Sequence, residues 1–163
     1  MSAPVDRPLI RPATAADGPA YIELVRGFAA FEKLEPPDDA AAARLLEHAF
    51  GARPRYELRV AEQGRALVAY AAFFETYSTF RALPSLFLED LYVRHEARGQ
   101  GIGASLLCHI ARVAVERGCG RLEWSVLDWN EGAQRFYRAQ GAKILAEWQL
   151  CRVDGDALLS LAG

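Results

Sequence analysis

The chain has 163 residues, 52% of them hydrophobic, and a formal net charge of −2 at pH 7. This length and composition predict one packed domain over residues 1–163. The near-neutral charge, without a lysine- or arginine-rich run, argues against a nucleic-acid-binding protein, because such proteins must neutralise phosphates. The three cysteines are odd in number for a disulfide framework and lack the C-x-x-C spacing of a zinc site. With no signal core and no apolar run near the ~18 residues of a membrane span, we expect a cytoplasmic protein.

Hydrophobic spacing and capping residues predict five elements in the first half of the chain. They are a strand at Leu9–Pro12, a helix from Thr14 to about Lys33, a helix from Asp38 or Asp39 to about Phe50, and two antiparallel strands at Tyr56–Glu62 and Ala66–Tyr77. Thr14 and Asp17 have the spacing of a capping box, which places the start of the first helix. Gly64 supplies the backbone angles of the tight turn between the two strands.

The second half is predicted to alternate strands and helices. The expected elements are a strand at Leu86–Val93, a helix from Gly101 to Arg117, a strand at Arg121–Leu127, a helix at Glu131–Gln140, one or two strands within Ala142–Val153, and a helical turn at Asp156–Ala162. Gly118 and Gly141 are placed to end the two longer helices. The resulting order, β-α-α-β-β-β-α-β-α-β, predicts a mixed α+β fold with a largely antiparallel central sheet flanked by helices.

A basic, glycine-rich turn joins the strand that ends at Val93 to the helix that follows it. Glycines at 99, 101 and 103 let the backbone approach a ligand, and the unpaired N–H groups of a helix start receive phosphate oxygens well. Arg98 adds a charge that can form two parallel hydrogen bonds to a phosphate. The spacing is neither that of an NTPase phosphate loop nor that of the dinucleotide-binding fingerprint. A glycine-rich connection without a ligand is the alternative interpretation.

Two motifs carry a resemblance to a known family. The sequence R98-GQ-G101-I-G103 after the strand LEDLYV resembles the coenzyme A pyrophosphate loop of the GNAT superfamily of N-acetyltransferases. The segment from Asn130 to Ala142 resembles the N-x-x-A-x-x-F-Y…G-A motif of the same superfamily. Over Ile10 to Leu161, the chain is similar to the spermidine/spermine and thialysine N-acetyltransferase branch. The resemblance implies the GNAT fold and acetyl-CoA as cosubstrate.

The same resemblance implies the residues that bind coenzyme A. These are the strand residues Leu91, Tyr92 and Val93, the loop and helix residues Arg98, Gly99, Gln100, Gly101, Ile102, Gly103 and Ala104, and the later Asn130. The strand would contribute main-chain groups to the pantetheine arm, in the manner of an added strand. Asn130 is also a suitable N-cap for the helix that begins at Glu131, and the two roles are compatible.

Acetyl transfer to an amine needs a base, because an alkyl amine with a pKa near ~10 is mostly protonated at neutral pH. It also needs a donor for the departing thiolate. By resemblance, Tyr137 is the general acid and Glu89 is the general base, acting directly or through water. A core tyrosine packed beside Phe136 is the alternative for Tyr137. Strand alternation predicts that Glu89 and its neighbour Asp90 point to opposite faces.

Substrate contacts are also implied by the resemblance, at Glu32, Ser78, Phe80, Asp90 and Trp148. Asp90 would hold the ammonium, although pairing with an arginine or a backbone group is an alternative. Glu32 could instead be a solvated helix carboxylate, and Trp148 a core or interface residue. The polyamine enzymes have an acid and a tryptophan where this chain has Ser78 and Phe80. This difference favours a lysine-like amine or a related diamine.

The sequence therefore predicts an N-acetyltransferase that works by direct attack of a small-molecule amine on acetyl-CoA. Cys119 lacks a positioned base, so no acyl-enzyme is expected, and His48, His95 and His109 are too scattered for a metal site. The resemblance also implies a homodimer that pairs through C-terminal strands. Alternatives are a protein or peptide N-acetyltransferase and a non-catalytic acetyl-CoA-binding module.

Overall fold

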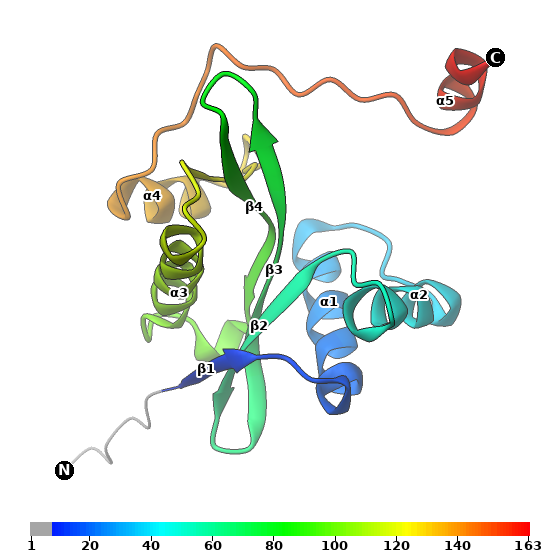
Figure 1. Cartoon of the computed structure of the whole chain (residues 1–163). Helices are drawn as coiled ribbons and strands as arrows, with labels where there is room; N and C mark the ends of the chain where they lie inside the picture. The colour runs from blue at the N-terminus through cyan, green and yellow to red at the C-terminus, as the bar shows by residue number, and fades with distance from the viewer. Residues whose placement is uncertain (1–7) are drawn as a thin grey trace. The chain divides into compact units, whose positions relative to one another are not determined.

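A five-stranded sheet forms the centre of the larger part of the protein (Figure 1). The computed structural model describes residues 8–163, and these divide into two compact units, residues 8–125 and 126–163. In the first unit the described strands lie in the order β1 (Leu9–Pro12), β2 (Glu57–Gln63), β3 (Ala66–Ser78), β4 (Leu83–Val93) and β5 (Leu122–Glu123). Neighbours among β1 to β4 are antiparallel, and β5 runs parallel to β4. This confirms the predicted mixed α+β fold with a largely antiparallel sheet.

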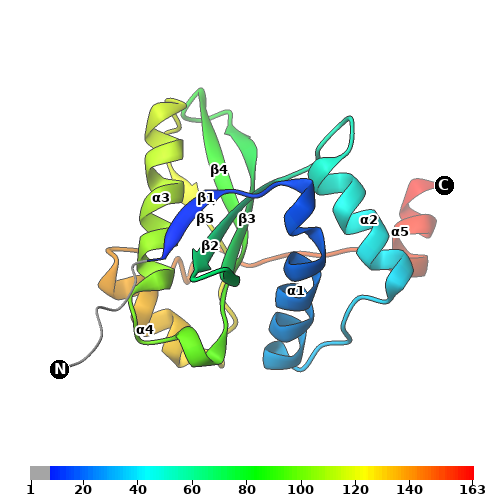
Figure 2. The ribbon, with the colours of Figure 1, turned by 90° about the horizontal axis from the view of Figure 1, so that it is seen from below.

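Helices cover both faces of the sheet in this unit. Figure 2 shows α1 (Gly18–Glu32) and α2 (Asp39–Phe50) on one side and α3 (Ile102–Glu116) on the other. The core on the α1 side consists of aliphatic and tyrosine side chains from α1, α2, β2, β3 and β4: Tyr21, Ile22, Leu24, Ala42, Leu58, Val60, Leu67, Tyr70, Ala72 and Tyr92. Burial of this apolar area is the main term that stabilises the unit.

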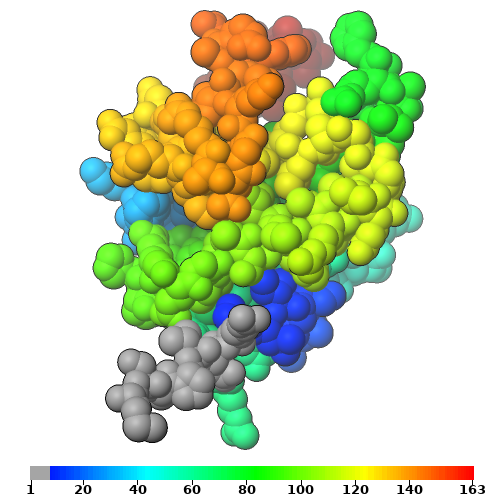
Figure 3. Space-filling view, turned by 90° about the vertical axis from the view of Figure 1, so that its left-hand side faces the viewer, coloured from blue at the N-terminus to red at the C-terminus, as the bar shows by residue number. Residues whose placement is uncertain are grey.

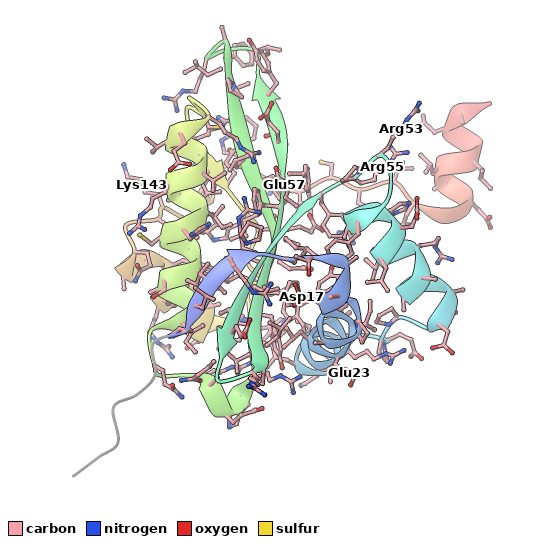
Figure 4. The ribbon with its side chains drawn as sticks, turned by 60° about the horizontal axis from the view of Figure 1, so that its bottom comes forward. Asp17, Glu23, Arg53, Arg55, Glu57 and Lys143 are labelled. Atoms are coloured by element: carbon pink, nitrogen blue, oxygen red, sulfur yellow. The ribbon has the colours of Figure 1, made fainter. Side chains whose placement is uncertain are left out.

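Capping residues begin the two N-terminal helices where the sequence predicts. A short 3₁₀ turn, η1 (Ala15–Asp17), precedes α1, and Thr14 and Asp17 form the expected capping box. Asp17, labelled in Figure 4, also accepts two hydrogen bonds from the guanidinium of Arg11, at 2.8 and 2.9 Å. Asp38 caps α2 by accepting a hydrogen bond from the Ala41 N–H at 2.7 Å.

An ion pair links the end of α3 to the sheet. Both terminal nitrogens of Arg117 donate to the carboxylate of Glu57, at 2.6 and 2.8 Å, and Glu57 is labelled in Figure 4 at the start of β2. The guanidinium of Arg117 also lies over the ring of Phe73, 6.0 Å from its centre. The side chains of α3 form a light-green to yellow-green band on the face shown in Figure 3.

The last strand of the sheet is shorter than the prediction of Arg121–Leu127. β5 pairs with β4 only at Leu86↔Leu122 and Phe87↔Glu123. The pairing ends two residues before Glu89, where the register of β4 with β3 is interrupted. A bulge bends its strand and disrupts the ladder, which accounts for the short parallel pairing.

The second unit contains two helices, α4 (Glu131–Ala139) and α5 (Gly155–Ala162). Both agree with the predicted helices, and Gly141 follows α4 with a φ of 88°. The strands predicted within Ala142–Val153 are wrong for the described structure, because this stretch has no strand. An alternating sequence becomes a strand only when it pairs with a neighbour, and the described unit offers no other strand.

None of the helices in the described part of the chain is both long and apolar enough to span a bilayer. Residues 8–163 also contain no cluster of three or more His, Cys, Asp or Glu side chains placed to hold a metal ion.

Candidate active site

The turn between β4 and α3 has the geometry of an anion cradle. After the short η2 turn (His95–Ala97), Gly99 and Gly101 have φ values of 76° and 77°, which only glycine adopts without strain. Gly101 is the N-cap of α3, so the N–H groups of Ile102, Gly103 and Ala104 lie in the first helical turn without acceptors inside the helix. These donors and the positive end of the helix dipole fit a pyrophosphate.

Arg98 is held at this cradle by contacts on two sides. Its Nε donates to the carbonyl oxygen of Val93 at 3.0 Å, and its guanidinium lies 4.5 Å from the ring centre of Phe31. The terminal nitrogens donate no hydrogen bond to residues 8–163 and are therefore available to an anion. Gln100 accepts a hydrogen bond from Gln63 at 3.2 Å, which ties the loop to the end of β2.

The edge of β4 beyond Phe87 is left open by β5 within the first unit. Leu91 and Val93 lie in this stretch, where an extended ligand could add to the sheet through main-chain groups. The side chain of Tyr92 belongs to the core and stacks on Phe28, with ring centres 5.4 Å apart. Any contact of Tyr92 with a cofactor is therefore limited to its backbone.

A bulge in β4 decides where the two adjacent carboxylates lie. Leu88 pairs with Phe73 and Asp90 pairs with Ala72, so Glu89 is the extra residue between them. In a regular strand Asp90 would share the face of Leu88, on the α3 side. The bulge instead moves Asp90 to the α1 face, whereas Glu89 is exposed. Alternation alone already separates the two adjacent side chains, and the bulge decides that Asp90, and not Glu89, is the carboxylate on the α1 face.

Asp90 lies in an acidic pocket of about 280 Å³. The pocket is lined by residues of α1, the following loop, α2, β3 and β4: Val25, Phe28, Ala29, Glu32, Leu34, Glu35, Pro37, Leu45, Tyr70 and Asp90. Three of these are carboxylates, and none of the described lining residues is basic. Two predicted substrate contacts, Glu32 and Asp90, are therefore brought together here.

Burial shifts the acidity of both of these carboxylates. It raises the pKa of Asp90 to about 6, although a hydrogen bond from the Tyr70 hydroxyl acts in the opposite direction. Burial also raises the pKa of Glu32. A carboxylate with a raised pKa lacks a compensating cation. The pocket is therefore suited to a ligand that brings a positive charge.

The other two predicted substrate contacts of the first unit lie elsewhere on the β3–β4 hairpin. Ser78 is buried at the end of β3, and its hydroxyl accepts a hydrogen bond from the Arg81 N–H at 3.4 Å. Phe80 is fully exposed in the turn. Ser78 is six residues along β3 from Ala72, the partner of Asp90, which corresponds to about 20 Å. Neither residue lines the acidic pocket.

The second unit carries the remaining predicted residues. Asn130 caps α4 by accepting a hydrogen bond from the Ala133 N–H at 3.0 Å, as the sequence predicted. Tyr137 is half-buried in α4, with its ring 5.1 Å from that of Phe136. Trp148 lies in the extended stretch between α4 and α5 and is 76% exposed.

Residues 22–142 match the family described as the acetyltransferase (GNAT) family, which is most of the chain. This chain belongs to the GNAT family. It is therefore an acyltransferase, and the resemblance drawn from the two motifs is confirmed. GNAT acetyltransferases use acetyl-CoA as cosubstrate, and the cradle at Gly99 and Gly101 fits its pyrophosphate.

Curated members of the GNAT family are similar over nearly the whole chain. Thialysine N-epsilon-acetyltransferase of Bos taurus is 37% identical over 166 residues, which cover 95% of this chain and 97% of that protein. Spermidine/spermine N(1)-acetyltransferase-like protein 1 of Homo sapiens is 31% identical over 163 residues, 94% of this chain and 23% of that protein. Among solved structures, the integron cassette protein VCH_CASS6 from the mobile metagenome of V. cholerae has a TM-score of 0.85 at 23% identity. That likeness covers 96% of this chain and 98% of the other, and supports the fold.

Tyr70 is a pocket residue that the sequence did not single out. It stands in an apolar strand where a tyrosine is normally a core residue, so its type and spacing gave no functional signal. Glu35 was also missed, because a carboxylate in the loop after a helix is ordinarily solvated. Only the packing of α1, the loop after it and β3 places both residues at one pocket.

Proposed function

We propose that this GNAT enzyme transfers the acetyl group of acetyl-CoA to the primary amine of a small cationic molecule, such as a lysine-like amine, diamine or polyamine. The observation that carries the proposal is the pocket that contains Glu32, Glu35 and Asp90. Its carboxylates attract an ammonium group, and its apolar walls accommodate an alkyl chain. A volume of about 280 Å³ suits a small amine better than a protein surface.

Among small amines, we favour a lysine-like acceptor. The likeness to the bovine thialysine enzyme extends over 97% of that protein, at 37% identity. Ser78 and Phe80 stand where, by the resemblance, polyamine enzymes have an acid and a tryptophan. Both observations support a basic amino acid or a related diamine over a long polyamine.

In the proposed mechanism the cosubstrate supplies an activated acetyl group, and two side chains move protons. Glu89 accepts a proton from the substrate's nitrogen through water, so that the neutral amine can attack. Tyr137 donates its hydroxyl proton to the thiolate that leaves. Asp90 and Glu32 hold the cationic substrate while this takes place.

Further parts of the proposal concern the remaining residues and the assembly. Asn130 contacts the pantetheine arm, and Ser78, Phe80 and Trp148 contribute to the acceptor site. The protein acts in the cytoplasm as a homodimer that pairs through its C-terminal segment. In the second unit this segment exposes Trp148 and Leu150, at 76% and 77%, which supports a partner for it.

The proposal is tested by measuring thiol release from acetyl-CoA with thialysine, lysine, putrescine and spermidine. Wild type is compared with Tyr137→Phe and Glu89→Gln, each of which should lower kcat about 10²- to 10⁴-fold if the side chain transfers a proton. Tyr77→Phe and Glu75→Gln alter exposed side chains of the same types on β3 and serve as matched controls. Their rates should equal that of wild type.

The pattern across the panel decides between substrate classes. Turnover of thialysine or lysine, lost in the two variants and kept in the controls, supports the mechanism and the lysine-like acceptor. Acetyl-CoA binding without acetylation of any amine would contradict the small-molecule function. A protein acceptor or a sensing role would then be the better explanation.

A further inference from the structure

The carboxylate of Asp90 is held by a single side chain. The Tyr70 hydroxyl donates to Oδ2 of Asp90 at 3.0 Å, and within residues 8–163 no other side chain donates to this carboxylate. Tyr70 is fully buried, and its ring and hydroxyl are therefore fixed by their surroundings. Both residues line the acidic pocket. The second oxygen, Oδ1, is thus left for a donor from outside the protein.

The neighbouring tyrosines leave Tyr70 as the hydroxyl that donates to Asp90. The Tyr56 hydroxyl donates to the carbonyl oxygen of Leu45 at 2.9 Å, so the Tyr21 hydroxyl, 3.1 Å from that of Tyr56, must be the donor in their contact. The hydroxyl hydrogen of Tyr21 is therefore not available to Asp90. The ring of Tyr70 packs edge-to-face against Tyr21, with centres 5.2 Å apart, which locks its orientation.

We propose that Tyr70 is a positioning residue for the acceptor amine: its hydroxyl holds Oδ2 of Asp90, so that Oδ1 accepts a hydrogen bond from the substrate's ammonium group. This inference rests on the proposed function, because it assigns an amine to the pocket. The competing explanation is that Tyr70 is a core tyrosine whose hydroxyl is merely satisfied by the nearest acceptor. The two explanations differ in the effect on Asp90 that they predict when the Tyr70 hydroxyl is removed.

The hydrogen bond from Tyr70 also keeps Asp90 charged. Burial disfavours the ionised carboxylate, and the nearby charges of Glu89 and Glu32 act in the same direction, whereas the hydroxyl of Tyr70 favours ionisation. Titratable groups surround Asp90 on several sides. They lie on α1, on β3, on β4, in the loop after α1 and in the loop after α2: Tyr21, Glu32, Glu35, Tyr56, Tyr70 and Glu89. None of them is basic, so loss of the Tyr70 hydroxyl would not be compensated. The carboxylate should then be neutral over a wider pH range and bind an ammonium less well.

The test compares Tyr70→Phe with the control Tyr77→Phe, which removes the hydroxyl of an exposed tyrosine on the same strand and leaves the tyrosines around Asp90 unchanged. The first measurement is an NMR titration of the Asp90 carboxyl carbon in the protein without substrates. Its midpoint should lie near 6 in wild type and Tyr77→Phe, and at higher pH in Tyr70→Phe. This measurement does not depend on turnover.

The second measurement is the pH dependence of KM for thialysine and for acetyl-CoA. In Tyr70→Phe the KM for thialysine should rise about tenfold near pH 6, the size expected for a lost hydrogen bond to a charged group. The increase should shrink at higher pH, and the KM for acetyl-CoA should stay as in wild type. Tyr77→Phe should change neither constant.

The double variant that carries both Tyr70→Phe and Asp90→Asn keeps the test decisive if Tyr70→Phe alone does not fold. It should fold more readily, because Asp90→Asn removes the buried charge. If Tyr70 acts through Asp90, adding Tyr70→Phe to Asp90→Asn should cause no further rise in the KM for thialysine. A further rise, or an Asp90 midpoint in Tyr70→Phe equal to that of wild type, would overturn the role of Tyr70. Failure of wild type to acetylate thialysine would count against the proposed lysine-like acceptor instead.

Discussion

Asp90 is a residue that the protein retains at a cost in stability. Burial raises the pKa of its carboxyl to about 6 in the folded protein, against an ordinary value of 3.8. The folded state therefore binds this proton more tightly than the unfolded state, and stability falls as pH rises from about 4 to about 6. Above that range the loss is complete and constant. A buried charge kept without a cation is typical of a binding site rather than of a core.

Asp90→Asn should therefore stabilise the protein in a pH-dependent manner. Relative to wild type, we expect a gain in unfolding free energy of about 2–3 kcal/mol at pH 8 and little gain at pH 4. Urea unfolding at both pH values measures the difference. Glu75→Gln, on the exposed side of β3, is the control because it leaves the pocket unchanged. An equal gain for Asp90→Asn at pH 4 and pH 8 would contradict the assigned burial.

At the scale of single residues, the sequence was informative where a side chain has an unusual type for its place. A carboxylate inside the apolar strand LEDLYV drew attention to Asp90, and the structure places it in a pocket with Glu32. Tyr70 escaped notice because a tyrosine in an apolar strand is ordinary. Its partner, Asp90, lies 20 residues further along the chain, and only strand pairing brings the two together.

The strand, turn and helix that form the anion cradle depend on backbone angles as well as on charge. Gly64 and Gly101 both have positive φ, 66° and 77°, and a Cβ added at either would meet no atom within 4 Å. Alanine at each position should therefore cost about 1 kcal/mol of stability through backbone strain alone. The two positions differ in place, since Gly64 lies in the β2–β3 turn and Gly101 caps α3.

Gly101→Ala should raise the KM for acetyl-CoA about tenfold, because relaxing the strain moves the first N–H groups of α3 away from the pyrophosphate. Gly64→Ala should leave this constant unchanged while losing the same stability. Steady-state kinetics and urea unfolding of both variants provide the comparison. An equal rise in KM for the two would indicate a general loss of folded protein and refute the role of the loop.

Elements with local signals were predicted well, whereas those that depend on partners were not. Asp38, Asn130 and the glycines at 118 and 141 set helix ends through short-range contacts, and the sequence placed them within a residue or two. The bulge at Glu89 has no such signal, because it arises from the register of β3 against β4. The shortened β5 has the same origin. Strand pairing is a long-range property that alternation alone does not determine.

At the scale of the whole molecule, the chain leaves an extended apolar segment without a partner in its own unit. Residues 142–154 form no strand, yet Ile144, Leu145, Trp148, Leu150 and Val153 are 42–77% exposed within this stretch. Apolar surface of this kind marks a site of association. Its main chain is also free of strand pairing and can add to a sheet edge of another copy.

We therefore expect the protein to form a dimer through this segment, with a mass twice the 18.0 kDa of the chain. Leu150→Glu should convert it to a monomer, because a charge in a buried interface is strongly unfavourable. Val115→Glu is the matched control, since Val115 on α3 is 78% exposed and Leu150 is 77% exposed. Size-exclusion chromatography with light scattering measures the mass of each protein across a range of concentrations.

A wild-type mass of one chain at every concentration, or a dimer that survives Leu150→Glu, would show that the segment does not hold two copies together. Loss of the dimer in Leu150→Glu but not in Val115→Glu would instead show that the interface, and not exposed apolar area in general, drives the pairing.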